Sequence, residues 1–89
     1  MLEKYVNKTI LFADKNCRGC REAEEKLKDK IQSGEIKVVY LDDPEGRRIA
    51  ELLRVKFVPD FAHVTKKGDT IKICRLDIFE NKVKECYEI

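Results

Sequence analysis

The stretch KTILFADKNCRGCREAEEKL, residues 8–27, joins the features that decide the fold. Residues 8–14 are short, apolar and rich in strand-forming side chains, which predicts a buried strand. A pair of cysteines separated by two residues follows the strand, and a helical pattern that ends at Gly34 comes next. The spacing of the pattern puts four side chains on one helix face. They are Cys20, Ala23, Leu27 and Ile31.

The middle of the chain predicts a second strand followed by a second helix. Residues 35–43, EIKVVYLDD, predict a second strand, and its apolar run suits a parallel strand covered on both faces. Asp43 and Pro44 provide an N-cap and a first-turn proline for a helix that reaches about Val55. The sequence therefore predicts a strand–helix–strand–helix order up to this point.

The last third predicts a hairpin and a closing helix. Residues 56–65 contain Pro59 and then a strand, residues 66–69 form a turn, and residues 70–76 form the next strand. From Asp77 onward, the apolar positions follow a broad helical stripe. These positions are Ile78, Phe79, Val83 and Cys86.

The full order is β-α-β-α-β-β-α in one domain, residues 1–89. A strand–helix–strand unit makes a right-handed crossover between parallel strands, and the later hairpin adds antiparallel strands. We expect an α/β protein with a four-stranded mixed sheet flanked by three helices on both faces.

Composition gives no reason to expect nucleic acid or membrane as a partner. Charged residues make up 40% of the chain, both signs are mixed throughout, and the net charge is only +2. No apolar run approaches the ~18 residues of a membrane span, and no signal peptide is visible. These features predict a cytoplasmic protein. Thiols are normally kept reduced there, so a closely spaced cysteine pair indicates catalysis or metal binding rather than a staple.

Two segments carry a resemblance to a known family. CRGC, residues 17–20, stands at a strand-to-helix junction, and LLRVKFVPDFAHVTKKGDTIK, residues 52–72, has a hydrophobic–proline step leading into a hairpin. Together with the order of elements, they resemble the thioredoxin superfamily, and the size is closer to glutaredoxin. Asn16 stands where thioredoxin has tryptophan, and Leu11 falls near the position of its buried aspartate.

The resemblance implies a thioredoxin-like fold and a protein disulfide oxidoreductase. It implies that the Val58–Pro59 bond is cis, that Pro59 lies against the cysteines, and that the Val58 backbone pairs with an extended substrate. No cofactor is expected, because a dithiol itself carries two electrons. The implied partners are disulfide-containing proteins, with a reductase or glutathione as the electron donor, and the chain is expected to be a monomer.

The residues themselves assign unequal roles to the two cysteines. Cys17 is expected at a helix N-terminus, where free backbone N–H groups and the helix dipole stabilise a thiolate. Cys20 is one turn further along, on the buried face. We therefore expect Cys17 to attack a substrate disulfide and Cys20 to resolve the mixed disulfide. Arg18 is a candidate for substrate binding and thiolate tuning, although a basic residue there also suits a solvated helix start.

Alternatives remain for the other cysteines. Cys74 and Cys86 are either buried small hydrophobic residues or a second disulfide. Glutathione-linked activity of the glutaredoxin kind is one alternative function. A zinc site of all four cysteines is another, although eleven residues separate Cys74 from Cys86 whereas structural zinc sites usually have two closely spaced pairs. We expect no metal, and we expect His63, the only histidine, to be a structural strand residue.

Overall fold

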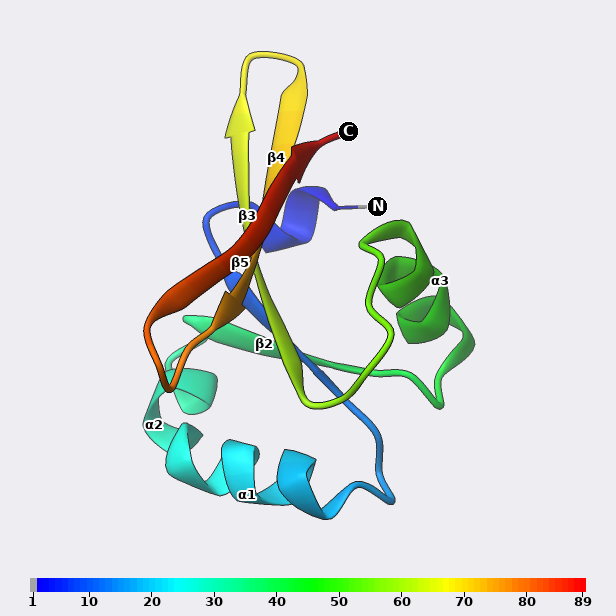
Figure 1. The fold of residues 1–89 in the computed structure, drawn as a ribbon, viewed down its shortest axis with the longest axis vertical. Coiled ribbons are helices and arrows are strands. Elements are labelled where there is room, and N and C mark those ends of the chain that lie inside the picture. The colour runs from blue at the N-terminus through cyan, green and yellow to red at the C-terminus, as the bar shows by residue number, and fades with distance from the viewer. Residues whose placement is uncertain (1) are drawn as a thin grey trace.

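Five strands form one mixed sheet in the order β2-β1-β3-β4-β5 (Figure 1). The computed structural model describes residues 2–89, so that Met1 of the predicted domain lies outside the described residues. The strands are β1 (Thr9–Ala13), β2 (Ile36–Tyr40), β3 (Asp60–Lys67), β4 (Thr70–Asp77) and β5 (Lys82–Glu88). The helices are α1 (Arg18–Lys26), α2 (Lys28–Gln32) and α3 (Pro44–Leu52), and a short 3-10 helix covers Glu3–Tyr5.

The strand pairing follows the predicted connections. β1 and β2 are parallel and are joined through α1 and α2, whereas β3 runs antiparallel to β1 and forms a hairpin with β4. The hairpin turn contains Gly68 with a φ of 62°, a backbone conformation that glycine adopts without strain. The β3–β4 hairpin extends beyond the helices at one end of the sheet (Figure 1).

Helices cover both faces of the sheet, and each face has its own core cluster. Successive residues of β1 point to opposite faces, so Phe12 packs in one cluster with Ile49 of α3, while Leu11 packs with Ala23 of α1. Figure 1 shows α1 and α2 on one side of the strands and α3 on the other. All residues of β1 from Ile10 to Ala13 are fully buried, as the apolar run predicts for a central strand.

The single helix predicted up to Gly34 is interrupted. Leu27, with φ −106° and ψ 16°, separates α1 from α2. The apolar stripe still faces the sheet, because Ala23 is buried and Leu27 and Ile31 pack against the same cluster. The predicted helix face is therefore correct, and the continuity of the helix is not.

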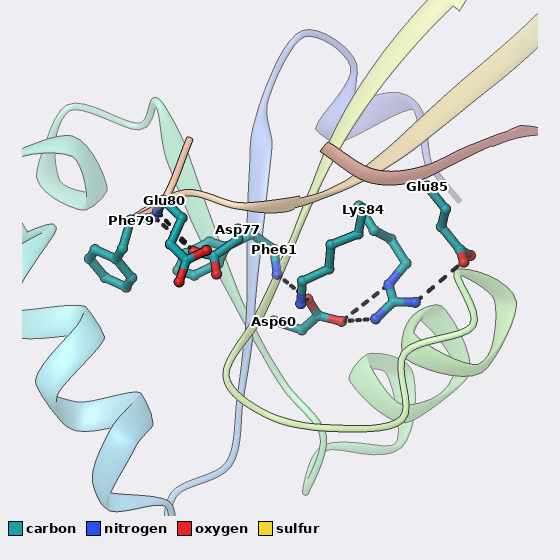
Figure 2. Close-up of polar contacts among 8 residues, drawn as sticks. Asp60, Phe61, Asp77, Phe79, Glu80, Lys84 and Glu85 are labelled. Atoms are coloured by element: carbon teal, nitrogen blue, oxygen red, sulfur yellow. Dashed lines mark hydrogen bonds and ion pairs between the residues drawn. The ribbon is translucent and has the colours of Figure 1, made fainter. Parts of the chain in front are cut away.

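The predicted closing helix is wrong, because its residues form a turn and the edge strand β5. The carboxylate of Asp77 accepts hydrogen bonds from the backbone N–H groups of Phe79 and Glu80, both at 3.1 Å, and this turn follows the end of β4 (Figure 2). Asn81 then adopts a φ of 56° and reverses the chain. The sheet consequently has five strands and not the expected four.

Contacts on both faces of the sheet hold β5 in place. The hydroxyl of Tyr87 donates a hydrogen bond to the backbone carbonyl of Leu53, at the end of α3. On the other face, Cys86 forms a disulfide with Cys74 of β4. The helical stripe seen in the sequence is therefore outweighed by contacts between segments distant along the chain.

Gly46 provides a test of the packing of α3 on β2. A Cβ atom there would overlap the backbone carbonyl oxygen of Tyr40 and would lie 3.1 Å from Cγ1 of Val39. We expect Gly46→Ala to lower the free energy of unfolding by about 2–3 kcal/mol. The higher helix propensity of alanine would by itself raise the free energy of unfolding by up to about 1 kcal/mol. The sign of the measured change therefore shows whether steric overlap or helix propensity dominates.

Urea denaturation measures this difference. Glu51→Ala, at an exposed position of the same helix, is the matched control and is expected to change stability by less than about 0.5 kcal/mol. A Gly46→Ala protein at least as stable as the original chain would contradict the close approach of α3 to the carboxyl end of β2.

Candidate redox site

The cysteine pair lies at the N-terminus of α1, where the chain leaves the central strand β1. Cys17 is the N-cap residue, with extended backbone angles, and its Sγ accepts a hydrogen bond from the backbone N–H of Cys20 at 3.1 Å. The N–H of Cys17 donates to the carbonyl oxygen of Asp14, also at 3.1 Å. The two cysteines form a disulfide, with their Cα atoms 5.2 Å apart.

The two sulfur-bearing residues differ in accessibility as the sequence predicts. Cys20 is fully buried, with 0% exposure, in the first turns of the helix face that also carries Ala23. Cys17 is only partly buried. An attacking thiol or an incoming disulfide therefore reaches Cys17 before Cys20.

Pro59 lies against the first turn of α1, which contains Gly19 and Cys20. The Val58–Pro59 bond is cis, as the resemblance implies. A Cβ atom added to Gly19 would lie 3.5 Å from Cδ of Pro59, which places the proline ring in contact distance of the residue just before Cys20. Val58 and Pro59 are both partly buried. The structure thus brings together two segments that are about forty residues apart in the sequence.

The basic residues around the pair contact neighbours other than the sulfurs. The side chain of Arg18 is 87% exposed, and its Nε lies 3.5 Å from Oε1 of Glu22. Nη1 of Arg21 donates to the carbonyl oxygen of Lys15 at 3.2 Å. These contacts fit a solvated helix start, and substrate binding by Arg18 stays a prediction.

Tyr40, at the end of β2, connects the sheet to α1 near the site. Its hydroxyl donates a hydrogen bond to Oε1 of Glu24 at 2.6 Å. This bond, together with burial and the nearby negative charges of Glu24, Asp42 and Asp43, raises the pKa of Tyr40 to about 12. Tyr40 therefore stays neutral at physiological pH and keeps its hydrogen bond to α1.

Sequence reasoning missed a buried charge next to the proline. Asp60 is 1% exposed, and its carboxylate accepts hydrogen bonds from Nη2 of Arg75 at 2.5 Å and from Nζ of Lys84 at 3.1 Å. The backbone N–H of Phe61 donates to the same carboxylate at 2.9 Å. A lone acidic residue inside the apolar run VPDFAHV, residues 58–64, was the available signal, since buried charges need partners.

The position of Lys84 depends on an irregularity in β5. Arg75 pairs with Glu85 and Leu76 pairs with Val83, so Lys84 is an extra residue in the ladder, a β-bulge. The bulge directs Lys84 to Asp60 from the edge of the sheet, as Figure 2 shows.

Arg75 stays charged although its side chain is only 15% exposed. Burial alone would lower the pKa of this guanidinium, but the hydrogen bond and the negative charge of Asp60, helped by Glu85, raise it. The residue after Pro59 is therefore fixed to β4 and β5 by charge pairs, and the proline segment is anchored from the α3 side of the sheet.

The remaining two cysteines lie in neighbouring strands at the edge of the sheet. Cys74 and Cys86 form a second disulfide between β4 and β5, which was one of the two readings that the sequence left open. Within residues 2–89, no group of three or more His, Cys, Asp or Glu side chains is placed to hold a metal ion. No helix in the same range is long and apolar enough to cross a membrane. Two disulfides do not favour the predicted cytoplasmic location.

Comparisons of the chain with protein-family models, with curated proteins and with solved structures gave no match. The resemblance to the thioredoxin superfamily therefore depends on the residues and the geometry described above. The observed features compatible with it are the small α/β fold and the Cys17–Cys20 pair at disulfide distance.

Proposed function

We propose that this protein is a thiol–disulfide oxidoreductase that acts on protein disulfides through Cys17 and Cys20. The observation that carries the proposal is the asymmetry of the pair: Cys17 is partly exposed and caps α1, whereas Cys20 is fully buried beside it. A disulfide that served only as a staple would gain little from this arrangement, because so short a loop hardly restricts the unfolded chain.

The geometry around Cys17 favours the thiolate form in the reduced protein. The N–H of Cys20 already donates to Sγ of Cys17 at 3.1 Å, and such a bond strengthens when the sulfur carries a negative charge. The positive end of the α1 dipole acts on the same atom. Exposure keeps the desolvation penalty of the thiolate small.

The reaction takes place in two exchanges. The Cys17 thiolate attacks one sulfur of the substrate disulfide, a mixed disulfide forms, and the other substrate sulfur leaves as a thiolate that takes up a proton. Cys20 then attacks Cys17, which releases the second substrate thiol and forms the Cys17–Cys20 disulfide. Two electrons pass to the substrate, and an external dithiol, glutathione or a reductase then supplies two further electrons that reduce the Cys17–Cys20 disulfide again.

The segment before Pro59 is the proposed binding surface for the substrate chain. The approach of Pro59 to Gly19 in the first turn of α1 supports this proposal, in which an extended substrate aligns with the backbone of Val58. Phe57, which is 76% exposed, adds apolar surface next to it. A substrate segment with an apolar residue near its cysteine therefore fits this surface best.

Insulin reduction tests the proposed activity. The wild-type protein, with dithiothreitol as donor, is expected to precipitate insulin B chains faster than dithiothreitol alone, which turbidity records. A parallel assay in which glutathione or a thioredoxin reductase replaces dithiothreitol distinguishes the two classes of electron donor. If the protein failed to accelerate the reaction with any of these donors, the proposal would be wrong.

A further inference from the structure

A row of four side chains crosses one face of the sheet from β1 to β5. Thr9 lies opposite His63, His63 lies opposite Cys74, and Cys74 lies opposite Cys86. Residues directly opposite in neighbouring strands point to the same face, with Cβ atoms about 4.5–5.5 Å apart. The row therefore lies on the face that α1 and α2 cover further along, where Leu11 and Phe61 pack with Ala23.

The two sulfurs of the second disulfide are unequally accessible. Cys86 is exposed and belongs to β5, the edge strand, whereas Cys74 is partly buried in β4. The strand pairing of β4 and β5 and the bond from Tyr87 to Leu53 hold β5 on the sheet independently of the disulfide. An incoming thiol therefore reaches Cys86 first, and opening the disulfide leaves most contacts of β5 intact.

His63 is placed to assist the sulfur that leaves. Its Nδ1 lies 3.0 Å from Oγ1 of Thr9, which fixes the orientation of the ring on its β1 side. Cys74 is the residue opposite His63 on the other side. An imidazole next to a departing thiolate stabilises it by donating a hydrogen bond or a proton.

On the same face, the neighbouring row of paired residues across β3, β4 and β5 includes a lysine. Thr65 lies opposite Lys72, and Lys72 lies opposite Glu88, two residues or roughly 7 Å along the strands from the cysteines. An open pocket of about 560 Å³ is lined by Thr65, Lys66, Lys67, Thr70, Lys72 and Glu88. Lys67 and Lys72 point to this face together with Glu88, whereas Lys66 alternates to the other face, so the three charged side chains give the pocket a net positive charge, which favours an anionic ligand.

We propose that Cys74–Cys86 is a second thiol–disulfide exchange site, one that reacts with anionic low-molecular-weight thiols. The thiolate of the small molecule attacks Sγ of Cys86 and forms a mixed disulfide there. The Sγ–Sγ bond breaks, and its electron pair goes to Cys74, whose thiolate His63 stabilises and protonates. A second small thiolate then attacks the mixed disulfide, which yields the Cys86 thiolate and the oxidised small molecule. Two electrons enter the protein.

The test uses the full chain with Cys17→Ser and Cys20→Ser, so that its outcome does not depend on the function proposed above. The oxidised variant is mixed with glutathione, quenched in acid and alkylated, and its peptides are mapped by mass. We expect glutathione on Cys86 and the alkyl group on Cys74. Glutathione on Cys74, or a disulfide that opens only after unfolding in guanidinium, would overturn the proposal.

Two comparisons test the roles of the lysine pocket and His63. Cysteamine, a cationic thiol, is expected to open the disulfide several-fold more slowly than glutathione at low salt, and the difference should shrink at high salt. His63→Gln is expected to slow opening roughly tenfold and to require a more reducing glutathione ratio for half-opening. Thr9→Val, which removes the hydrogen bond but keeps the imidazole, is the matched control with a smaller effect.

Each comparison has an outcome that contradicts the assignment it tests. Equal rates with the two thiols would show that the lysine pocket does not select the ligand. An unchanged half-opening ratio in His63→Gln, or an equal change in Thr9→Val, would mean that His63 acts only by packing.

Discussion

Replacing Cys17 with serine is expected to reduce the rate of insulin reduction to that of dithiothreitol alone. Cys20, the other sulfur of the pair, is fully buried and cannot replace the lost nucleophile. Serine keeps the size and the N-capping ability of the residue, so α1 should remain folded. The loss would therefore report on the missing sulfur and not on a damaged fold, and turbidity assays with circular dichroism as a folding check measure both.

The controls for this experiment are the other two cysteines. Cys74→Ser and Cys86→Ser are expected to keep most of the activity, because they lie on other strands and the mechanism does not use them. Undiminished activity of Cys17→Ser would refute the assignment of the nucleophile.

Asp60→Ala is expected to lower the free energy of unfolding by about 3–5 kcal/mol. The substitution removes the carboxylate that accepts hydrogen bonds from Arg75 and Lys84. Arg75, with only 15% of its side chain exposed, would keep its positive charge with Glu85 alone nearby, at 3.8 Å. Leaving such a charge without its main partner is the source of the cost.

Denaturant titration measures this loss, and Lys84→Met separates the two ion pairs. Lys84 is 46% exposed, so water replaces much of its interaction, and its removal should cost no more than about 1 kcal/mol. If Asp60→Ala cost no more than Lys84→Met, the buried pair with Arg75 would not be the main contribution. Insulin reduction by Asp60→Ala should also fall, because Asp60 anchors the residue next to Pro59.

Much of the fold could be predicted from local patterns. The apolar run around Phe12 and the helical stripe through Ala23 each concern one segment, and each occupies the predicted face. The closing helix could not be predicted in this way. Val83 and Cys86 fit a helical stripe, but Asp77 and Asn81 make a turn, and contacts with β4 and α3 then stabilise a strand.

In the candidate site, too, local patterns predict some features, whereas others depend on contacts between distant segments. The unequal burial of Cys17 and Cys20 follows from helix geometry and is readable from four residues of sequence. The position of Pro59 beside them was implied by the resemblance alone. Nothing local indicates that Lys84 reaches Asp60, because that contact depends on a β-bulge in a strand that the sequence pattern assigns to a helix.

The most direct measurement of the central claim is the trapped intermediate of Cys20→Ser. Without Cys20, the mixed disulfide between protein and substrate cannot be resolved from within and should accumulate. Mass mapping after incubation with a disulfide-containing protein is expected to find the substrate attached to Cys17, in an amount far above that in wild-type protein. Attachment at Cys74 or Cys86, or no covalent complex at all, would contradict a Cys17–Cys20 exchange cycle.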